Sequence, residues 1–559
     1  MPVLPSSPSD FTATVKSAAI ANASVGGVSF RPSKNSGGYV SLGALGAIVT
    51  QSVVARATIS QRFDPDLASA PAAPSIVESI TLQNTTTGTE DTFIVKYDTA
   101  GSIQWARKIG GTDIQIGSDI ITDSSRNIYV IGTSTGSTTI FGSDNTTTAF
   151  SLGNNGSNDT FIVKYNASGV PQWARRIGGL NDELGTAIAV DSTGNVYIVG
   201  HSNSPLRIFA ANDLSTVFST ATTESVDIFL VKYNTDGTPL WYRKLSSANN
   251  DFARDMSIDS DGSLLIAGYT TGSTFNLLDA TDTAAITLTY TTSINGFLVK
   301  YDTNGKPQWG RKVSNNISYG NAVATDASNN VYVYGSYFGY AVFTATGNIS
   351  PSLTLPSPFT DGNAFIVKYS SSGEPIWIRS IIAGINNDSG RVATDSLGNL
   401  YITGYYNGSF TVRDGNNSGI LTSPSSGEND VFIIKYDTNG ELKWYRRIGS
   451  SGSVSDYGLG IVVDSSGNVY TTGFYTSTVS VFNGNGTTTG TTAFTTLANA
   501  GGRDAFLVKY NTTGTPLWAA RMNGTGTDQG TGVTIDSAGN ICVTGSFTSA
   551  SLTLRTTGF

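Results

Sequence analysis

The stretch DTFIVKYNASGVPQWARRIGG, residues 159–179, followed by TAIAVDSTGNVYIVG, residues 186–200, decides the fold. Its segments FIVKY and QWARRI are short and rich in β-branched and aromatic residues, which predicts β-strands. An Asn-x-x-Gly turn joins them, and an Asp-Ser-x-Gly turn joins TAIAV to NVYIVG. Asp or Asn opens such a turn by accepting backbone hydrogen bonds, and Gly takes the positive φ that follows. The stretch therefore predicts two hairpins and four strands, without any helical period.

This pattern occurs seven times in the 559 residues, at intervals of mostly 68 residues. Each copy holds one Trp, with a Phe twelve residues before it, a Lys nine before it and an Asp about 18 after it. The Trp positions are Trp105, Trp173, Trp241, Trp309, Trp377, Trp444 and Trp518. The Lys positions are Lys96, Lys164, Lys232, Lys300, Lys368, Lys435 and Lys509. A fixed period of this size indicates a solenoid or a propeller.

Four-stranded sheets repeated radially make a propeller, so the sequence predicts an all-β, seven-bladed β-propeller with four-stranded blades. The ragged ends favour a ring over a linear solenoid. Only 23 residues follow Asp536, so the last copy lacks its second half, and the first copy starts at Phe93 without a preceding AIAVDSxGN hairpin. We therefore expect the N-terminal and C-terminal half-blades to pair, with the joint near Glu78.

The domain boundary is expected after the Pro-Ala linker Pro71–Pro74. Residues 75–559 form the propeller in this prediction. Residues 1–74 contain no Trp and no repeat, and they are rich in Ala, Ser, Gly and Val. They are compatible with a small β domain or with an arm that orders on a neighbouring subunit, and we favour an arm or anchor.

The repeats resemble the SBBP (beta-propeller repeat) family. The resemblance rests on D-x-F-[IL]-[VI]-K-Y, on the Trp strand and on D-S-x-G-N-[VIL]-Y-x-x-G, and it covers Ser75–Phe559. It implies a propeller, mostly in surface-type proteins of bacteria and in some large-virus proteins, and no catalytic residues. Arg126 and Asn329 replace Gly in two turns, and Ala520 stands where the other copies have Arg.

The amino-acid composition argues against some classes of binding partner. Charged residues make up 13% of the chain, against roughly 25% in ordinary domains. The net charge of −8 argues against nucleic acid and against anionic membranes as partners. The most apolar early stretch, Val40–Val54, is too short to span a bilayer, and the N-terminus lacks the pattern of a signal peptide.

Residues with reactive side chains are few, and each has a simpler structural interpretation. His201, the only histidine, is interpreted as a surface residue at a strand end, because a catalytic His needs a nucleophile or acid nearby. Cys542 is expected to be a buried, inert thiol. Asp259-Ser-Asp261-Gly262 offers too few oxygens for calcium. The sequence thus predicts no catalytic residue, no metal and no cofactor.

The seven Lys and the Arg that stands two residues after six of the seven Trp form basic rings. An anion-binding ring is one interpretation. We favour a structural one, in which the Asp or Asn two residues before each Phe pairs with these side chains. Likewise, the Trp ring is expected to pack between blades. The Arg positions are Arg107, Arg175, Arg243, Arg311, Arg379 and Arg446.

The predicted function is a non-enzymatic structural or interaction module, displayed on a virion or cell surface and anchored by its N-terminal segment. Its expected partners are a protein or neighbouring subunits, with a glycan as a further candidate. The variable excursions between the second hairpin of one copy and the next Phe are the expected contact face. The alternative is a lectin-like, ligand-binding or hydrolytic propeller with a site in the axial funnel.

Overall fold

The computed structural model describes residues 79–557, apart from 212, 214, 221–224, 315–316, 339–340, 345–351, 356–362, 385–389, 414–418, 424–426, 451 and 485–492. These residues belong to one compact unit, Val77–Phe559. Their regular structure is entirely strand, and no helix in this part of the chain could cross a membrane. The predicted arm, residues 1–74, lies outside the described residues.

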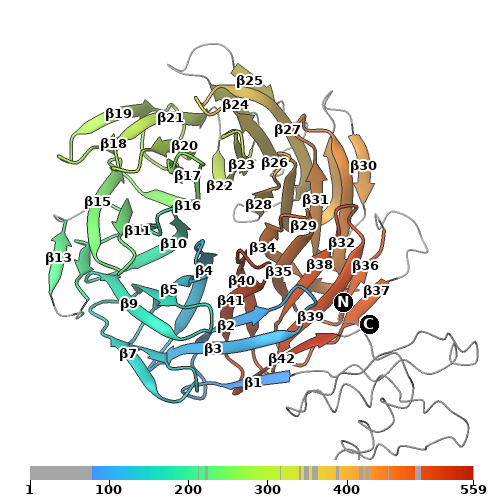
Figure 1. Cartoon of the computed structure of the whole chain (residues 1–559). Coiled ribbons are helices and arrows are strands. Elements are labelled where there is room, and N and C mark those ends of the chain that lie inside the picture. Colours follow the sequence, from blue (N-terminus) through green and yellow to red (C-terminus); the bar gives the residue numbers. More distant parts are fainter. Residues whose placement is uncertain are drawn as a thin grey trace, which may run out of the picture. The chain divides into compact units, whose positions relative to one another are not determined.

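Each repeat supplies strands at four positions of a sheet, counted outward from the axis as inner, second, third and fourth. The inner strands, which surround the centre of the ring in Figure 1, are β4 (Gln115–Thr122), β10 (Glu183–Val190), β16 (Asp251–Ile258), β22 (Ser318–Thr325), β28 (Arg391–Thr394), β34 (Tyr457–Val463) and β40 (Asp528–Ile535). The second strands are β5 (Ile128–Ser134), β11 (Val196–Ser202), β17 (Leu264–Thr270), β23 (Val331–Tyr337), β29 (Leu400–Arg413), β35 (Val469–Tyr475) and β41 (Ile541–Phe547).

The third and fourth strands carry the Phe–Lys and Trp–Arg motifs. The third strands are β2 (Asp91–Tyr97), β8 (Asp159–Tyr165), β14 (Asp227–Tyr233), β20 (Asn295–Tyr301), β26 (Asn363–Tyr369), β31 (Gly427–Tyr436) and β38 (Asp504–Tyr510). The fourth strands are β3 (Ile103–Gly111), β9 (Pro171–Gly178), β15 (Pro239–Ser246), β21 (Pro307–Ser314), β27 (Pro375–Gly384), β32 (Leu442–Gly449) and β39 (Pro516–Asn523).

The excursions form outer hairpins that the sequence analysis did not count. Each one pairs with the Trp strand of the preceding sheet, so the chain crosses between neighbouring sheets three times per repeat. The hairpins are β6–β7 (Thr138–Phe141, Thr148–Leu152), β12–β13 (Arg207–Phe209, Thr216–Ser219), β18–β19 (Thr274–Leu278, Ala284–Thr289), β24–β25 (Ala341–Thr344, Ser352–Leu355) and β36–β37 (Val479–Phe482, Ala493–Leu497). Two further short strands, β30 (Gly419–Ser423) and β33 (Gly452–Ser455), pair with β29 and β31.

The predicted seven blades of four strands are therefore wrong. The strands form six hydrogen-bonded sheets, five with six strands and one with twelve. The blades have more strands than expected because the outer hairpins add to them.

The count is lower than seven because β29 is continuous. Its first part pairs with β28 and β31, whereas its last part pairs with β27 and β30. In the neighbouring repeats the second strand and the outer strand are separate, as in β35 and β36. Gly408, with φ of 75°, lies in β29 between these two parts. One sheet thus holds the repeats of Trp377 and Trp444.

The two ends of the described chain close the ring. β41 pairs along its whole length with β2, from Asp91 opposite Phe547 to Tyr97 opposite Ile541. In addition, β42 (Ser551–Thr557) pairs with both β39 and β1 (Ser79–Gln83). β42 and β1 thus replace an outer hairpin that is continuous elsewhere, and the expected pairing of the two ends is present.

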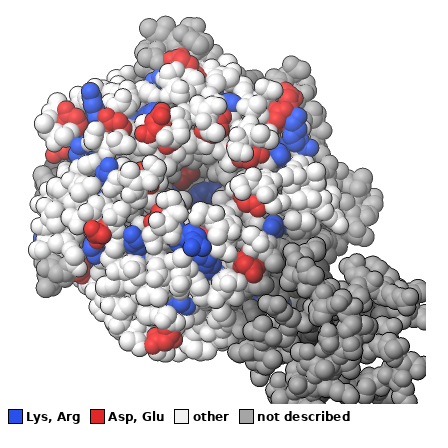
Figure 2. Space-filling model, in the orientation of Figure 1, with Lys and Arg blue, Asp and Glu red and all other residues white. Residues whose placement is uncertain are grey.

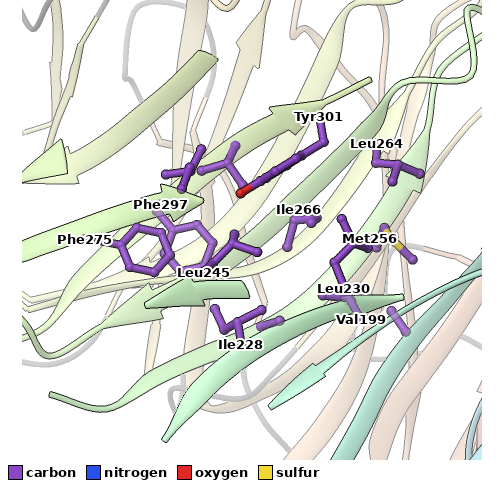
Figure 3. Packing of buried hydrophobic residues seen from close by; sticks show 14 of the residues in the cluster. Val199, Ile228, Leu230, Leu245, Met256, Leu264, Ile266, Phe275, Phe297 and Tyr301 are labelled. Carbon is purple, nitrogen blue, oxygen red and sulfur yellow. The ribbon is translucent and has the colours of Figure 1, made fainter. Parts of the chain in front are cut away.

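The hydrophobic core lies between neighbouring sheets. In Figure 3, Leu230 and Phe275 come from one sheet, whereas Met256 and Phe297 come from the next. The rings of Phe275 and Phe297 stack with centroids 4.6 Å apart. Phe297 also lies over Gly268 in the adjacent strand, where a Cβ atom would be 2.7 Å from its Cζ. This contact explains why each repeat sets a Gly opposite its Phe.

A first prediction concerns the turn at Arg126. This exposed residue has φ of 65° where five of the six sister turns have glycine, and a side chain in this conformation costs free energy. We expect Arg126→Gly to raise the free energy of unfolding by about 1 kcal/mol, after subtraction of the flexibility gained by the unfolded chain. Equilibrium denaturation measures the difference.

Asn329→Gly is the matched control for this prediction. Asn329 also has positive φ, but its side chain bonds Ser260 and Asp261 in the neighbouring turn. It should therefore gain nothing. An unchanged or lower stability of Arg126→Gly would contradict the argument.

Buried carboxyl groups lie where one sheet meets the next. Asp528, at the start of β40, accepts hydrogen bonds from Ser549 Oγ at 2.8 and 2.9 Å. Burial, together with the neighbouring Asp504, raises the pKa of Asp528 to about 7. Burial likewise raises the pKa of Glu183 and Asp251 to about 7. At the equivalent positions of β4 and β22 the chain has uncharged Gln115 and Ser318.

These raised pKa values predict that the protein is more stable in mild acid. Unfolded carboxyl groups titrate near pH ~4, so between about pH 4 and 7 the folded chain binds more protons than the unfolded one. The contribution of these carboxyl groups to the free energy of unfolding is therefore fully present below the pKa of the unfolded chain, and it is lost as the pH rises through about 7. We expect a higher melting temperature at pH 5 than at pH 8. In the variant Asp528→Asn the difference should shrink; equal pH dependence of both chains would refute this assignment.

Candidate ligand site in the axial channel

The repeated Lys, Trp and Arg side chains hold the next repeat. In the first repeat Lys96 and Trp105 both donate to Ala167 O at 3.2 Å, whereas the Arg107 guanidinium donates to the turn carbonyls of Ser168 and Gly169 at 3.0 and 2.6 Å. We call these three side chains, in any repeat, the Lys–Trp–Arg cluster. The Arg contacts occur for Arg107, Arg175, Arg243, Arg311, Arg379 and Arg446.

The turn glycine fits tightly against this cluster. Gly169 has φ of 74°, and a Cβ atom there would lie 2.9 Å from Trp105 Cδ2 and 3.0 Å from Arg107 Nε. The last cluster differs, because Ala520 replaces the arginine. There Lys509 and Trp518 donate to Thr99 O at 3.1 and 3.4 Å. The basic rings thus contact backbone carbonyls of the neighbouring repeat.

The acidic partners differ from those expected. Asp159, two residues before its Phe, pairs with Arg176, three residues after Trp173, at 2.9 Å. The Lys of the cluster instead meets the Asp of the second hairpin, as in Lys96–Asp536 at 2.7 Å. The sequence pattern thus predicted which residue types form ion pairs, but not which positions pair with each other.

A different set of residues lines the axis. Inner strands carry a bulge at one position, shown by register shifts such as that between Gly117 and Asp119. The residues at this position, including its equivalent at the start of β28, are Ser118, Thr186, Arg254, Asn321, Arg391, Leu459 and Thr531. A β-bulge re-aims the extra side chain, and the residue type at this position differs between repeats.

Five of these bulge residues line one cavity of about 410 Å³, together with Thr133, Leu184, Gly185, His201, Phe252 and Tyr269. The lining comes from inner and second strands of several sheets, so the cavity lies on the axis. Figure 2 shows a central hollow with basic and acidic side chains inside it. Phe252 lies at the start of β16 and Tyr269 near the end of β17. The cavity is therefore near the face that carries the links between repeats.

Two polar groups in the cavity are buried without a partner among the described residues. Asn321 is 2% exposed, and neither its Nδ2 nor its Oδ1 is hydrogen-bonded. His201 Nδ1 is likewise unbonded. An unsatisfied buried polar group costs free energy, so these atoms call for a hydrogen-bonding partner from outside the described residues.

His201 lies next to the end of β11, as expected, but it is half-buried in the wall of the axial cavity and not on the outer surface. Its ring lies edge-on to Phe252 with centroids 5.0 Å apart, within the cavity lining. Burial and the nearby Arg254 lower its pKa to about 4, so the imidazole is neutral at physiological pH.

Charged groups of both signs meet in the channel. Burial and the like charge of Asp255 raise the pKa of Asp119 to about 7, while Arg391 lowers it. Asp119 accepts from the amide of Ile188 at 3.1 Å, and Asp255 accepts from that of Val323 at 2.8 Å. Both carboxyl groups thus bond an inner strand of the next repeat.

The other reactive candidates have structural surroundings. Cys542 is fully buried, and burial raises the pKa of its thiol to about 12. Asp259 closes a hairpin turn by accepting from the amides of Asp261 and Ser263 and pairs with Lys300 at 2.7 Å. In the part of the chain that the structure describes, no three His, Cys, Asp or Glu side chains are grouped to hold a metal.

The sequence contained a signal for the axial site that the analysis missed. Aligning the inner strands on the bulge position shows Arg254, Asn321 and Arg391 at that position, and Asp119 and Asp255 at the next. The sister repeats have Ser, Thr or Leu at the first position and Ala, Val or Gly at the second. The expectation that the blades are equivalent therefore fails at the axis.

The ring of repeats defines this chain as a β-propeller repeat protein. Three segments of the chain, residues 104–138, 172–207 and 443–474, match the SBBP family, described as beta-propeller repeat. The resemblance drawn from the sequence is thereby confirmed.

Two curated relatives share part of the chain. The uncharacterized WD repeat-containing protein L264 of Acanthamoeba polyphaga mimivirus is 28% identical over 363 residues, 56% of this chain and 26% of the relative. The regulatory protein FlaEY of Caulobacter vibrioides is 30% identical over 191 residues, 32% of this chain and 18% of the relative. The chain thus corresponds to a minor part of either relative.

Similarity to solved structures is low. The Neurospora crassa Pan2 WD40 domain has a TM-score of 0.17 and 14% identity, over 47% of this chain and 85% of that one. A Bacteroides caccae protein of unknown function has a TM-score of 0.25 and 9% identity, over 53% of this chain and 91% of that one. No inference about function follows from similarity at this level.

Proposed function

We propose that this propeller is a non-enzymatic interaction module, displayed on a virion or cell surface and anchored through residues 1–74. The observation that carries the proposal is the use of the repeated Lys–Trp–Arg clusters. Their polar groups bond the neighbouring repeat, as Arg107 does with Ser168 and Gly169. The repeat therefore builds a rigid ring, and recognition is left to residues specific to one repeat.

Two further features support a binding role. The acids of the channel, Asp119 and Asp255, accept backbone amide hydrogens, which suits structural acceptors better than a general acid and base. The low charge content of 13% also suits a surface that packs against neighbours. The similarity to a WD repeat-containing protein of a virus is compatible with display on a virion.

The test is the mass in solution of the full chain and of a chain that starts at Ser75, measured by light scattering. The described propeller forms a compact unit from Val77 onward, so the shorter chain should fold. We expect the full chain to assemble and the shorter chain to be a monomer. If both are monomers of equal compactness, residues 1–74 do not act as an assembly anchor and this part of the proposal fails.

Surface display is tested separately in the source particle or cell. Protease added from outside should cleave the propeller loops while the particle stays intact. Protection of the propeller until the particle is lysed would contradict display.

A further inference from the structure

We propose that the axial cavity binds an acidic sugar, a pyranose ring that carries one carboxylate. This inference deepens the proposed function, because it assigns the ligand class of a site within the binding module. It rests on four features of the cavity lining: an unbonded amide, an aromatic wall, guanidinium groups and a volume suited to one or two sugar rings.

The unbonded amide fits sugar hydroxyl groups. Asn321 offers both a donor and an acceptor, and neither has a partner among the described residues. A hydroxyl group donates and accepts, so one hydroxyl or a neighbouring pair satisfies both amide atoms. Ser118, Thr133 and Thr186 add further hydroxyl groups to the lining.

Aromatic side chains form the apolar part of the cavity wall. Phe252 and Tyr269 are stacked with centroids 4.8 Å apart and planes 22° apart, and His201 closes this wall edge-on. The Arg254 guanidinium lies over the Tyr269 ring, 5.2 Å from its centroid. Apolar walls with a few placed polar groups are typical of small-molecule sites.

The guanidinium groups fit a carboxylate. Arg254 and Arg391 both line the cavity, and arginine matches a carboxylate with two parallel hydrogen bonds. Burial raises the pKa of Asp119 and Asp255, and the charge of Arg391 nearby opposes that rise. These acids offset part of the positive charge, so a single carboxylate suits the site better than a phosphate or a nucleotide.

The size of the cavity fits a short ligand. Its volume of about 410 Å³ lies near the lower end of the range of about 300–1,000 Å³ for small-molecule sites. A long polymer would have to enter through the channel end-first. The class that satisfies every group is therefore a monosaccharide or disaccharide of the uronic acid type.

The test is calorimetric titration of the full chain with sodium D-glucuronate, D-glucose and sodium acetate. We expect glucuronate to bind about tenfold or more tightly than either comparator, because each comparator satisfies only part of the cavity. Equal affinity for acetate would show a simple anion site and overturn the proposal. Absence of glucuronate binding to the folded chain would also overturn it.

Single substitutions test whether glucuronate binds in the axial cavity. Asn321→Leu and Arg254→Gln should each weaken glucuronate binding by about tenfold or more, whereas exposed Arg207→Gln in β12 should not. Asn321→Leu should also keep or raise the melting temperature, because it removes unbonded buried groups. Binding that is unchanged in Arg254→Gln and Asn321→Leu would place glucuronate elsewhere and refute the site.

The light-scattering test of the proposed function is independent of these readouts. A chain that assembles through residues 1–74 but does not bind glucuronate would refute only the ligand. A monomer that binds glucuronate would refute only the anchor.

Discussion

Arg107→Met should lower the free energy of unfolding by about 3 kcal/mol, because it removes hydrogen bonds from a charged donor and leaves buried carbonyls unsatisfied. The Arg107 guanidinium is almost completely buried, at 7% exposure for the residue. It donates to Gly169 O, Ser168 O and Ala106 O at 2.6 to 3.0 Å. Chemical denaturation of the full chain, followed by Trp fluorescence, measures the loss.

Arg207→Met is the matched control, because Arg207 is exposed on the outer strand β12. It should change stability by no more than about 0.5 kcal/mol. Gly169→Ala tests the same contact from the other side, since its Cβ atom would meet Trp105 and Arg107. If Arg107→Met costs no more than the control, the Lys–Trp–Arg cluster does not hold neighbouring repeats together.

Removal of Asp528–Phe559 should abolish cooperative folding, which is the largest effect that we expect. This change deletes β40, β41 and β42 and exposes the edge of β2, where Phe93, Ile94 and Val95 are fully buried. A long apolar edge of this kind pairs with other chains. Circular dichroism melting and size-exclusion chromatography should show a broad transition and aggregates.

A chain that lacks residues 1–74 is the control for this deletion, because it keeps β1 and every strand of the ring. Its melting temperature should equal that of the full chain. A sharp, unshifted transition after loss of β40–β42 would mean that the ends of the chain do not hold the ring.

Much of the fold could be predicted because the same strand and turn pattern occurs seven times in the sequence. The turn motifs, the Trp–Phe spacing and the incomplete first and last copies correctly indicated an all-β ring whose ends pair. The strand count was wrong because the outer hairpins have no shared sequence pattern. They pair through backbone groups with a distant Trp strand, as β6 does with β3.

The blade count was wrong for a related reason. Whether β29 continues from Tyr406 into Phe410 or breaks depends on backbone geometry around Gly408, not on a motif. The twelve-stranded sheet that results merges two repeats that look separate in the sequence. The number of sequence repeats therefore does not give the number of hydrogen-bonded sheets.

The axial site could not be predicted from the residues that all repeats share. The bulge position has Arg in two repeats, Asn in one, and Ser, Thr or Leu in the others, so no repeated motif marks Arg254, Asn321 and Arg391. Their convergence follows only from ring closure, which brings equivalent positions of distant repeats together around one axis. Residues that depart from a repeat at its innermost position are the signal to seek in such chains.

Backbone hydrogen exchange at the joint tests the closed ring most directly. We expect peptides from β2 and β41 to exchange as slowly as those from the internal pair β11 and β14, because each pair is in register over seven residues. Exchange at β2 and β41 that is much faster, while β11 and β14 stay protected, would contradict the account and leave an open chain of sheets.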